Sequence, residues 1–270
     1  MHDSTAAPAR WTSPPSSARA DTRLVASVVS REALAEPDRA AMCALMDAYY
    51  EGVTPDRFRD DLVEKGAVIL LRARETGAIV GFSTLMTLTV IVDGEPVAGV
   101  FSGDTIVARD HWGEGLLARV WIDAVLAEVR SLQRTRPGAP VYWFLICAGY
   151  KTFRYLPLFF RRFVPQVGAA GDGGGARDAA RLRRIAAAFA RAKFGDAFDE
   201  AAGVVRLRHA TPLRTGVADV TTARLRDPAV AFFAAANPGH ARGDELVCLA
   251  EVSLENLTPA GLRMVGERRG

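Results

Sequence analysis

The 270-residue sequence has few cysteines and no long apolar segment. Cys43, Cys147 and Cys248 lie far apart and form no Cys-x-x-Cys pair, which argues against a disulfide framework or a metal site and favours a reducing compartment. The longest apolar run, residues 141–148, is too short to cross a bilayer. Residues 1–20 lack the apolar stretch of a secretory signal and read as a disordered leader. We therefore expect a cytoplasmic protein without a metal or a membrane partner.

Positive charges exceed negative charges by only a small number. The 34 basic residues, nearly all of them arginine, stand against 31 acidic ones, a formal net charge of +3. This balance gives no sign of a nucleic-acid partner. Because 49% of the residues are hydrophobic, a chain of this length can bury a large core. We expect one domain over residues 21–270.

The hydrophobic pattern predicts a mixed α+β fold. Strands are expected over residues 24–30, 67–71, 79–92, 97–107 and 141–147, and helices from Pro37, from Thr54-Pro55 and over residues 113–132. Asp93-Gly94 is a strong hairpin signal, so three of these strands form an antiparallel meander. The next helix and the apolar strand complete a crossover, which makes the strands ending near Val107 and Cys147 parallel neighbours.

Residues 107–121, VARDHWGEGLLARVW, join a strand to a helix through two glycines. The unpaired N–H groups and positive dipole end of a helix start favour a phosphate, and Gly113 and Gly115 leave room for it. The stretch also fits the dinucleotide pattern G-x-G-x-x-A. Five residues separate the strand from the first glycine, however, and the next strand does not end in an acidic residue. A tight turn without a ligand remains the third interpretation.

The order of these elements over residues 24–163 resembles the GNAT superfamily of acyl-CoA-dependent N-acyltransferases. HWGEG, residues 111–115, is similar to the W-G-x-G variant of its pyrophosphate motif, with Leu117 at the final small position. YLPLFF, residues 155–160, resembles the Tyr-x-x-x-Gly-Phe end of a later helix. The resemblance implies a central, mostly antiparallel sheet with one parallel crossover, helices on both faces, and acetyl-CoA or another acyl-CoA as substrate.

The resemblance also implies site residues. The acyl-CoA contacts fall on Val107, Trp112, Gly113, Glu114, Gly115, Leu116, Leu117 and Ala118. Tyr155 takes the place of the acid that protonates the departing thiolate, and the first helix, with Tyr49 and Tyr50, lines the acceptor site. Tyr155 and Tyr49 could instead be core aromatics, and Tyr150 is the alternative candidate for the acid.

Amine acylation also needs a base. Asp104 is a carboxylate in an otherwise apolar strand, which is costly unless it is paired or functional. Ser102 alternates to the same face and could orient Asp104 or the acceptor. His240, with a pKa near neutrality, is the other candidate, although a solvated loop histidine or a structural aspartate would explain either residue.

The rest of the chain departs from the resemblance. Residues 165–242 are predicted to be a largely helical insertion that shapes an acceptor pocket or an interface, followed by a final strand and helix over 244–267. Arginines at 181, 183 and 184 form either a solvated face or a docking patch for an acidic acyl-carrier protein.

The leading hypothesis is direct transfer of an acyl group, most simply acetyl, from acyl-CoA to an amine of a small molecule or protein. The alternatives are a GNAT-fold protein that uses a carrier-protein thioester or another reaction, and a non-catalytic module that binds CoA or a phosphate ligand. The sequence leaves a homodimer open.

Overall fold

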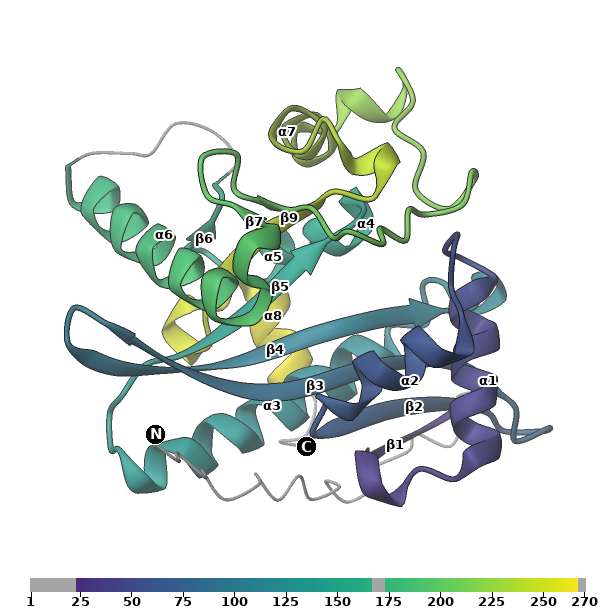
Figure 1. Ribbon diagram of the computed structural model, residues 1–270. Helices are drawn as coiled ribbons and strands as arrows, with labels where there is room; N and C mark the ends of the chain where they lie inside the picture. The colour runs from purple at the N-terminus through teal and green to yellow at the C-terminus, as the bar shows by residue number, and fades with distance from the viewer. Residues whose placement is uncertain (1–22, 167–172, 267–270) are drawn as a thin grey trace.

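The computed structural model describes residues 23–166 and 173–266 and is centred on one mixed sheet (Figure 1). Its strands are β1 Leu24–Ser30, β2 Ala67–Ala73, β3 Ile79–Val92, β4 Glu95–Val107, β5 Val141–Cys147, β6 Phe163–Val164, β7 Phe198–Asp199, β8 Val204–Val205 and β9 Glu245–Glu251. Their order is β1-β2-β3-β4-β5-β9-β8-β7, with β6 paired to β9. Of the described pairs, β4 and β5 are parallel and the others antiparallel. The predicted α+β class is confirmed; the predicted leader lies outside the described residues.

Strands β3 and β4 form a long hairpin because of the two residues at its tip. Asp93 and Gly94 both have positive φ, 53° and 81°. Positive φ at both central residues is the requirement of a type I′ turn, whose twist matches that of the flanking strands. Together with β2, this hairpin is the meander that the sequence predicts.

Helix α3, Leu116–Thr135, connects β4 to its parallel neighbour β5. The β4–β5 ladder ends at the pair Ser102↔Leu145, although both strands continue beyond it. The two strands therefore part at their carboxyl ends, beside the start of α3. This crossover, following a meander, is the arrangement that the GNAT resemblance implies, and the resemblance is confirmed as one of fold.

Helices cover both faces of the sheet (Figure 1). One face carries α3 with α4 Tyr150–Phe153, α5 Tyr155–Phe159, α7 Pro228–Ala236 and α8 Pro259–Gly266. The other face carries α1 Glu36–Asp47, α2 Pro55–Val63 and α6 Gly173–Phe194. Strand β5 lies between the two layers, which explains why its sequence is apolar at successive positions rather than alternating.

Phe189 anchors α6, the main helix of the predicted insertion, on the sheet. Its ring is fully buried and stacks on Phe144 of β5, with centroids 5.5 Å apart. Gly99 of β4 lies against the same ring, because a Cβ on it would be 2.7 Å from a ring carbon of Phe189. The aromatic ring therefore fills the space that a side chain on β4 would take.

The exposed side of α6 differs in part from expectation. The helix spans Gly173–Phe194, within the predicted helical insertion. Arg181 donates to the Tyr142 hydroxyl and Arg184 to Asp93. Two of the three arginines are thus occupied by partners within the chain.

Replacing Phe189 with alanine should destabilise the protein by about 3–5 kcal/mol, because the lost ring leaves a cavity between α6 and the sheet. Urea unfolding measures this loss. The control is Arg191→Ala on the same helix, which removes an exposed ion pair with Glu200 and should change stability by less than about 1 kcal/mol. Equal effects of the two substitutions would contradict the anchoring role of Phe189.

Candidate functional site

Three cavities meet where β4 and β5 part. The largest, about 520 Å³, lies along residues 111–118 and is called the turn cavity. A second, about 200 Å³, contains the side chains of Asp61, Asp104 and Glu245 and is called the carboxylate cavity. The third, about 70 Å³, is the apolar cavity under α3. Thr105 of β4 and Thr152 of α4 line all three, so the cavities adjoin at these two residues.

The turn cavity ends at the start of α3. Gly113 and Gly115 have φ of 96° and 67°, which a residue with a Cβ adopts only with strain. The first backbone bond of the helix runs from the Arg119 N–H to the Gly115 carbonyl, so the N–H groups of residues 116–118 have no intrahelical acceptor. The helix dipole adds positive potential at the same point. This end of the cavity is built to receive an anion.

Trp112 stabilises the turn from its outer side. Its indole N–H donates to the Val107 carbonyl at 2.7 Å, which ties the turn back to the end of β4. The Lys151 ammonium lies 3.2 Å from the centroid of one Trp112 ring, in a cation–π contact. The Tyr49 hydroxyl accepts the Arg109 N–H at 2.7 Å. Tyr49 therefore supports the turn, and it lines the turn cavity rather than the carboxylate cavity.

Charged groups of the turn are already paired with one another. The Glu114 carboxylate accepts from Arg23 at 3.0 Å and lies 2.9 Å from His111 Nδ1. Leu116, Leu117 and Ala118 line the cavity on the helix side, and Leu117 is buried in the core as well. The structure thus brings all the residues predicted to contact acyl-CoA to one cavity.

Tyr155 stands between the turn cavity and the apolar cavity and lines both. Its ring stacks on Phe159, with centroids 5.6 Å apart. Desolvation raises the pKa of Tyr155, so its hydroxyl keeps its proton at neutral pH. Arg154 beside it is paired with Asp227 at 3.3 Å. Tyr150, by contrast, is buried and lines none of the three cavities.

The carboxylate cavity holds a buried lysine among acidic groups. Lys65, whose side chain is 2% exposed, donates to Asp61 at 2.8 Å. Burial alone would raise the pKa of Asp61, but the Lys65 ammonium holds it below its usual value. Burial and then the neighbouring negative charge of Asp61 raise the pKa of Asp104 to about 7. Asp104 is thus half ionised near neutral pH, as a general base requires.

Sequence reasoning missed Glu245, the third carboxyl group of this cavity. Burial, followed by the charges of Asp104 and Asp61, raises the pKa of Glu245 to about 8. It is the first residue of β9, which runs antiparallel to β5, so that its start lies beside the carboxyl end of β5. The only sequence signal is an acidic residue opening an apolar strand; the strand order supplies the proximity to Asp104.

The prediction that Ser102 and Asp104 share a face is wrong. Ser102 pairs with Leu85 and Thr105 with Ser83, so two residues of β4 oppose Thr84 alone, which is a β-bulge. The bulge breaks the alternation of side chains. Ser102 faces the apolar cavity, and Asp104 faces the carboxylate cavity.

The bulge depends on Gly103. A Cβ there would lie 2.5 Å from the Thr84 hydroxyl oxygen and 3.0 Å from Cε of Lys65. The missing side chain therefore lets the lysine stem reach the acidic groups.

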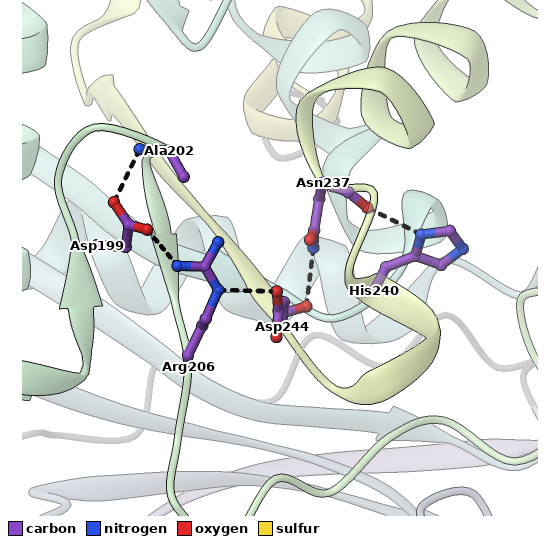
Figure 2. A network of polar contacts seen from close by, with 6 residues as sticks. All are labelled: Asp199, Ala202, Arg206, Asn237, His240 and Asp244. Carbon is purple, nitrogen blue, oxygen red and sulfur yellow. Dashed lines mark hydrogen bonds and ion pairs between the residues drawn. The ribbon is translucent and has the colours of Figure 1, made fainter.

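His240 belongs to a different network, shown in Figure 2. Its Nδ1 lies 2.9 Å from the Asn237 carbonyl oxygen. The Asn237 side chain donates to the Asp244 carbonyl at 2.8 Å, and Arg206 donates to the Asp244 carboxylate at 3.1 Å. These bonds close the loop between α7 and β9. His240 lines none of the three cavities, so the structure does not bring this predicted base to Asp104 and Tyr155.

Residues of the predicted insertion line two of the cavities. Leu213 pairs with Tyr50 in an isolated β-bridge, and Arg214 donates to Asp47 at 3.0 Å, which fixes the segment beside α1. Leu213, Val217 and Ala218 line the turn cavity, while Leu207, His209 and Thr211 line the carboxylate cavity. Tyr50 lines both, and burial raises its pKa. This agrees with the expected contribution of the insertion to a pocket.

No family model and no curated protein matches the sequence. Among solved structures, 164 chains match. A GNAT family N-acetyltransferase from Escherichia coli in complex with CoA is 18% identical, with a TM-score of 0.33 over 53% of this chain and 72% of that one. An acetyltransferase from Trypanosoma brucei is 21% identical, with a TM-score of 0.36 over 54% of this chain and 98% of that one.

A protein from Enterococcus faecalis described as a probable N-acyltransferase is 13% identical, with a TM-score of 0.39 over 52% of this chain. The present chain spans 33% of that protein. Within residues 23–166 and 173–266, there is no helix long and apolar enough to cross a membrane, and no group of three or more His, Cys, Asp or Glu side chains placed to hold a metal ion.

The raised pKa of Asp104 leads us to expect a pH-dependent effect of this residue on the stability of the folded protein. Between about pH 4 and about pH 7 the folded carboxyl group binds a proton that the unfolded chain has released, so its contribution to stability is lost as pH rises through this range. The stability of Asp104→Asn relative to the wild type should therefore rise between about pH 4 and about pH 7 and level off above about pH 7.

Urea unfolding at several pH values measures this gain. The control is Asp60→Asn, at an exposed position of α2. A stability difference between Asp104→Asn and the wild type that does not change with pH would contradict the assignment.

Proposed function

We propose that this protein transfers an acyl group from an acyl-CoA to an amine. The observation that carries the proposal is the meeting of the three cavities at Thr105 and Thr152. One cavity offers an anion seat and another offers carboxyl groups of raised pKa. A thioester carbonyl at the junction would have the rest of the donor in the turn cavity and the acceptor amine in the carboxylate cavity.

The donor would lie in the turn cavity. The pyrophosphate of the donor would accept hydrogen bonds from the free N–H groups of residues 116–118. Lys151 and Arg154, which also line the turn cavity, would be the nearby cations. Gly113 and Gly115 keep side chains away from that seat. The pantetheine arm would run along the open edge of β4, where β5 no longer supplies a partner strand. The thioester would then reach the junction of the cavities.

The acceptor amine would enter the carboxylate cavity, whose lining includes Asp104. Asp104 would take the proton that the nitrogen must lose before it can attack. The amine then adds to the thioester carbonyl, and the carbon–sulfur bond breaks. The leaving thiolate would take a proton from Tyr155, whose raised pKa keeps that proton available until the thiolate forms. The acyl group would pass directly from the sulfur to the nitrogen, without a covalent intermediate on the protein.

Binding of the donor is tested by calorimetric titration with acetyl-CoA. Gly115→Glu should abolish the binding, because the new side chain places negative charge at the anion seat and strains a backbone with φ of 67°. Gly138→Glu is the matched control, since Gly138 also has positive φ, 75°, but lies outside the three cavities. Failure of the wild type to bind, or equal weakening by both variants, would overturn the proposed seat.

The base is tested by the pH dependence of turnover. With acetyl-CoA and a panel of primary amines, kcat/KM should rise with pH and level off above the pKa values of about 7 and about 8 given for Asp104 and Glu245. Asp104→Asn should lower kcat/KM by about 10²-fold or more and change this profile. A variant that keeps both the rate and the profile of the wild type would remove Asp104 from the mechanism.

The acid is tested separately with Tyr155→Phe. This variant keeps the ring that stacks on Phe159 and loses only the hydroxyl, so it should bind acetyl-CoA normally while kcat falls by about 10²-fold. Calorimetry and release of the CoA thiol measure the two quantities. Unchanged turnover would exclude Tyr155 as the proton donor.

A further inference from the structure

Transfer of an acetyl group does not require the apolar cavity, although this cavity lies at the same junction. Besides Thr105 and Thr152, which line all three cavities, it shares Leu117, Ala118 and Tyr155 with the turn cavity. It therefore begins at the point where the thioester is placed by the proposed function. Trp143 and Phe160, whose ring centroids are 5.5 Å apart, also line it.

The polar atoms of this cavity are largely satisfied by one another. The Ser102 hydroxyl oxygen accepts the indole N–H of Trp121 at 2.7 Å and that of Trp143 at 3.0 Å. Two such bonds occupy both acceptor positions of a hydroxyl oxygen. The two indoles are thereby fixed against each other, with centroids 4.5 Å apart. The aromatic wall is rigid and offers a bound group apolar surface.

Charge is missing from the same wall. Of the described residues that line the apolar cavity, none is acidic or basic. A carboxylate placed there would be desolvated without a partner, which is costly. The cavity therefore favours a hydrocarbon chain and disfavours a dicarboxylic acyl group.

The volume sets the length of the chain. About 70 Å³ is room for about five to seven groups the size of a water molecule, at 10–15 Å³ each. A methyl or methylene group is of similar size. An acetyl group would leave most of this space empty, and a long fatty chain would extend beyond it.

We propose that the donor carries an uncharged, apolar acyl chain of about six carbons, with its tail in the apolar cavity. This inference rests on the proposed function and specifies its donor. Each buried methylene strengthens binding, and four additional ones give up to about 10²-fold in affinity when fully buried. Hexanoyl-CoA should thus be bound and used at least tenfold better than acetyl-CoA.

The experiment compares acetyl-, butanoyl-, hexanoyl-, octanoyl- and succinyl-CoA, by calorimetry and by turnover with the same amine. We expect the maximum at hexanoyl-CoA. Butanoyl-CoA should be preferred to succinyl-CoA, which has the same chain length but carries a carboxylate. Equal binding of acetyl- and hexanoyl-CoA, or a preference for succinyl-CoA, overturns the inference and leaves the proposed function standing. If none of the five binds, both are overturned.

Two substitutions on α3 should move the preferred length in opposite directions. Ile122→Phe fills the cavity and should shift the preference to acetyl- or butanoyl-CoA, whereas Trp121→Leu enlarges it and should shift the preference to octanoyl-CoA. General loss of stability cannot produce opposite shifts, so the pair remains informative even if both variants are less stable. Leu126→Phe is the control, because Leu126 is on the same helix but lines none of the cavities. An unchanged preference in both test variants overturns the assignment.

Discussion

The parting of β4 and β5 after Ser102 and Leu145 is the constraint on which the site depends. Two parallel strands that stay paired leave no space between them, and helices on both faces would then seal the sheet. Once the strands part, the sheet has an opening near its centre that side chains must line. The bulge at Gly103 and Asp104 lies at the start of this opening and sends the side chains of Ser102 and Asp104 to opposite faces. One local irregularity thus determines which chemical groups each cavity receives.

The acidic groups of the carboxylate cavity are held at a cost to stability. Three carboxyl groups share a poorly hydrated space, and the buried Lys65 offsets only part of their repulsion. Folding alone would be better served by apolar residues at these positions. A cluster of this kind, at the end of a cavity that opens to the turn, is typical of a site that must exchange protons. Phe189 and the other buried aromatic residues of the neighbouring α6 layer supply the stability against which such a site can be maintained.

Sequence patterns predicted the elements well and the relations between distant residues less well. Asp93-Gly94 gave the hairpin, and the two glycines of the turn gave the start of α3, because both signals act within a few residues. The relation of Ser102 to Asp104 failed because a bulge has no signature in the alternation of polar and apolar residues. Glu245 was missed because strand order alone brings β9 beside β5. The position of His240 outside the three cavities could not be foreseen, because the Asn237 carbonyl that it contacts leaves no pattern in the sequence.

The insertion supplies walls to the turn and carboxylate cavities but contributes nothing to the apolar cavity. It is held on the outside of the site, by Arg214 on Asp47 and by the bridge between Leu213 and Tyr50. The apolar cavity is lined mainly by residues of β3, β4, β5, α3, α4, α5 and α8 instead. Under the proposed function, the choice of acceptor and the choice of acyl chain are therefore encoded in separate stretches of the chain. Under the proposed function, exchanging the stretch between α6 and β9 would change the acceptor while the choice of acyl chain stayed as it was.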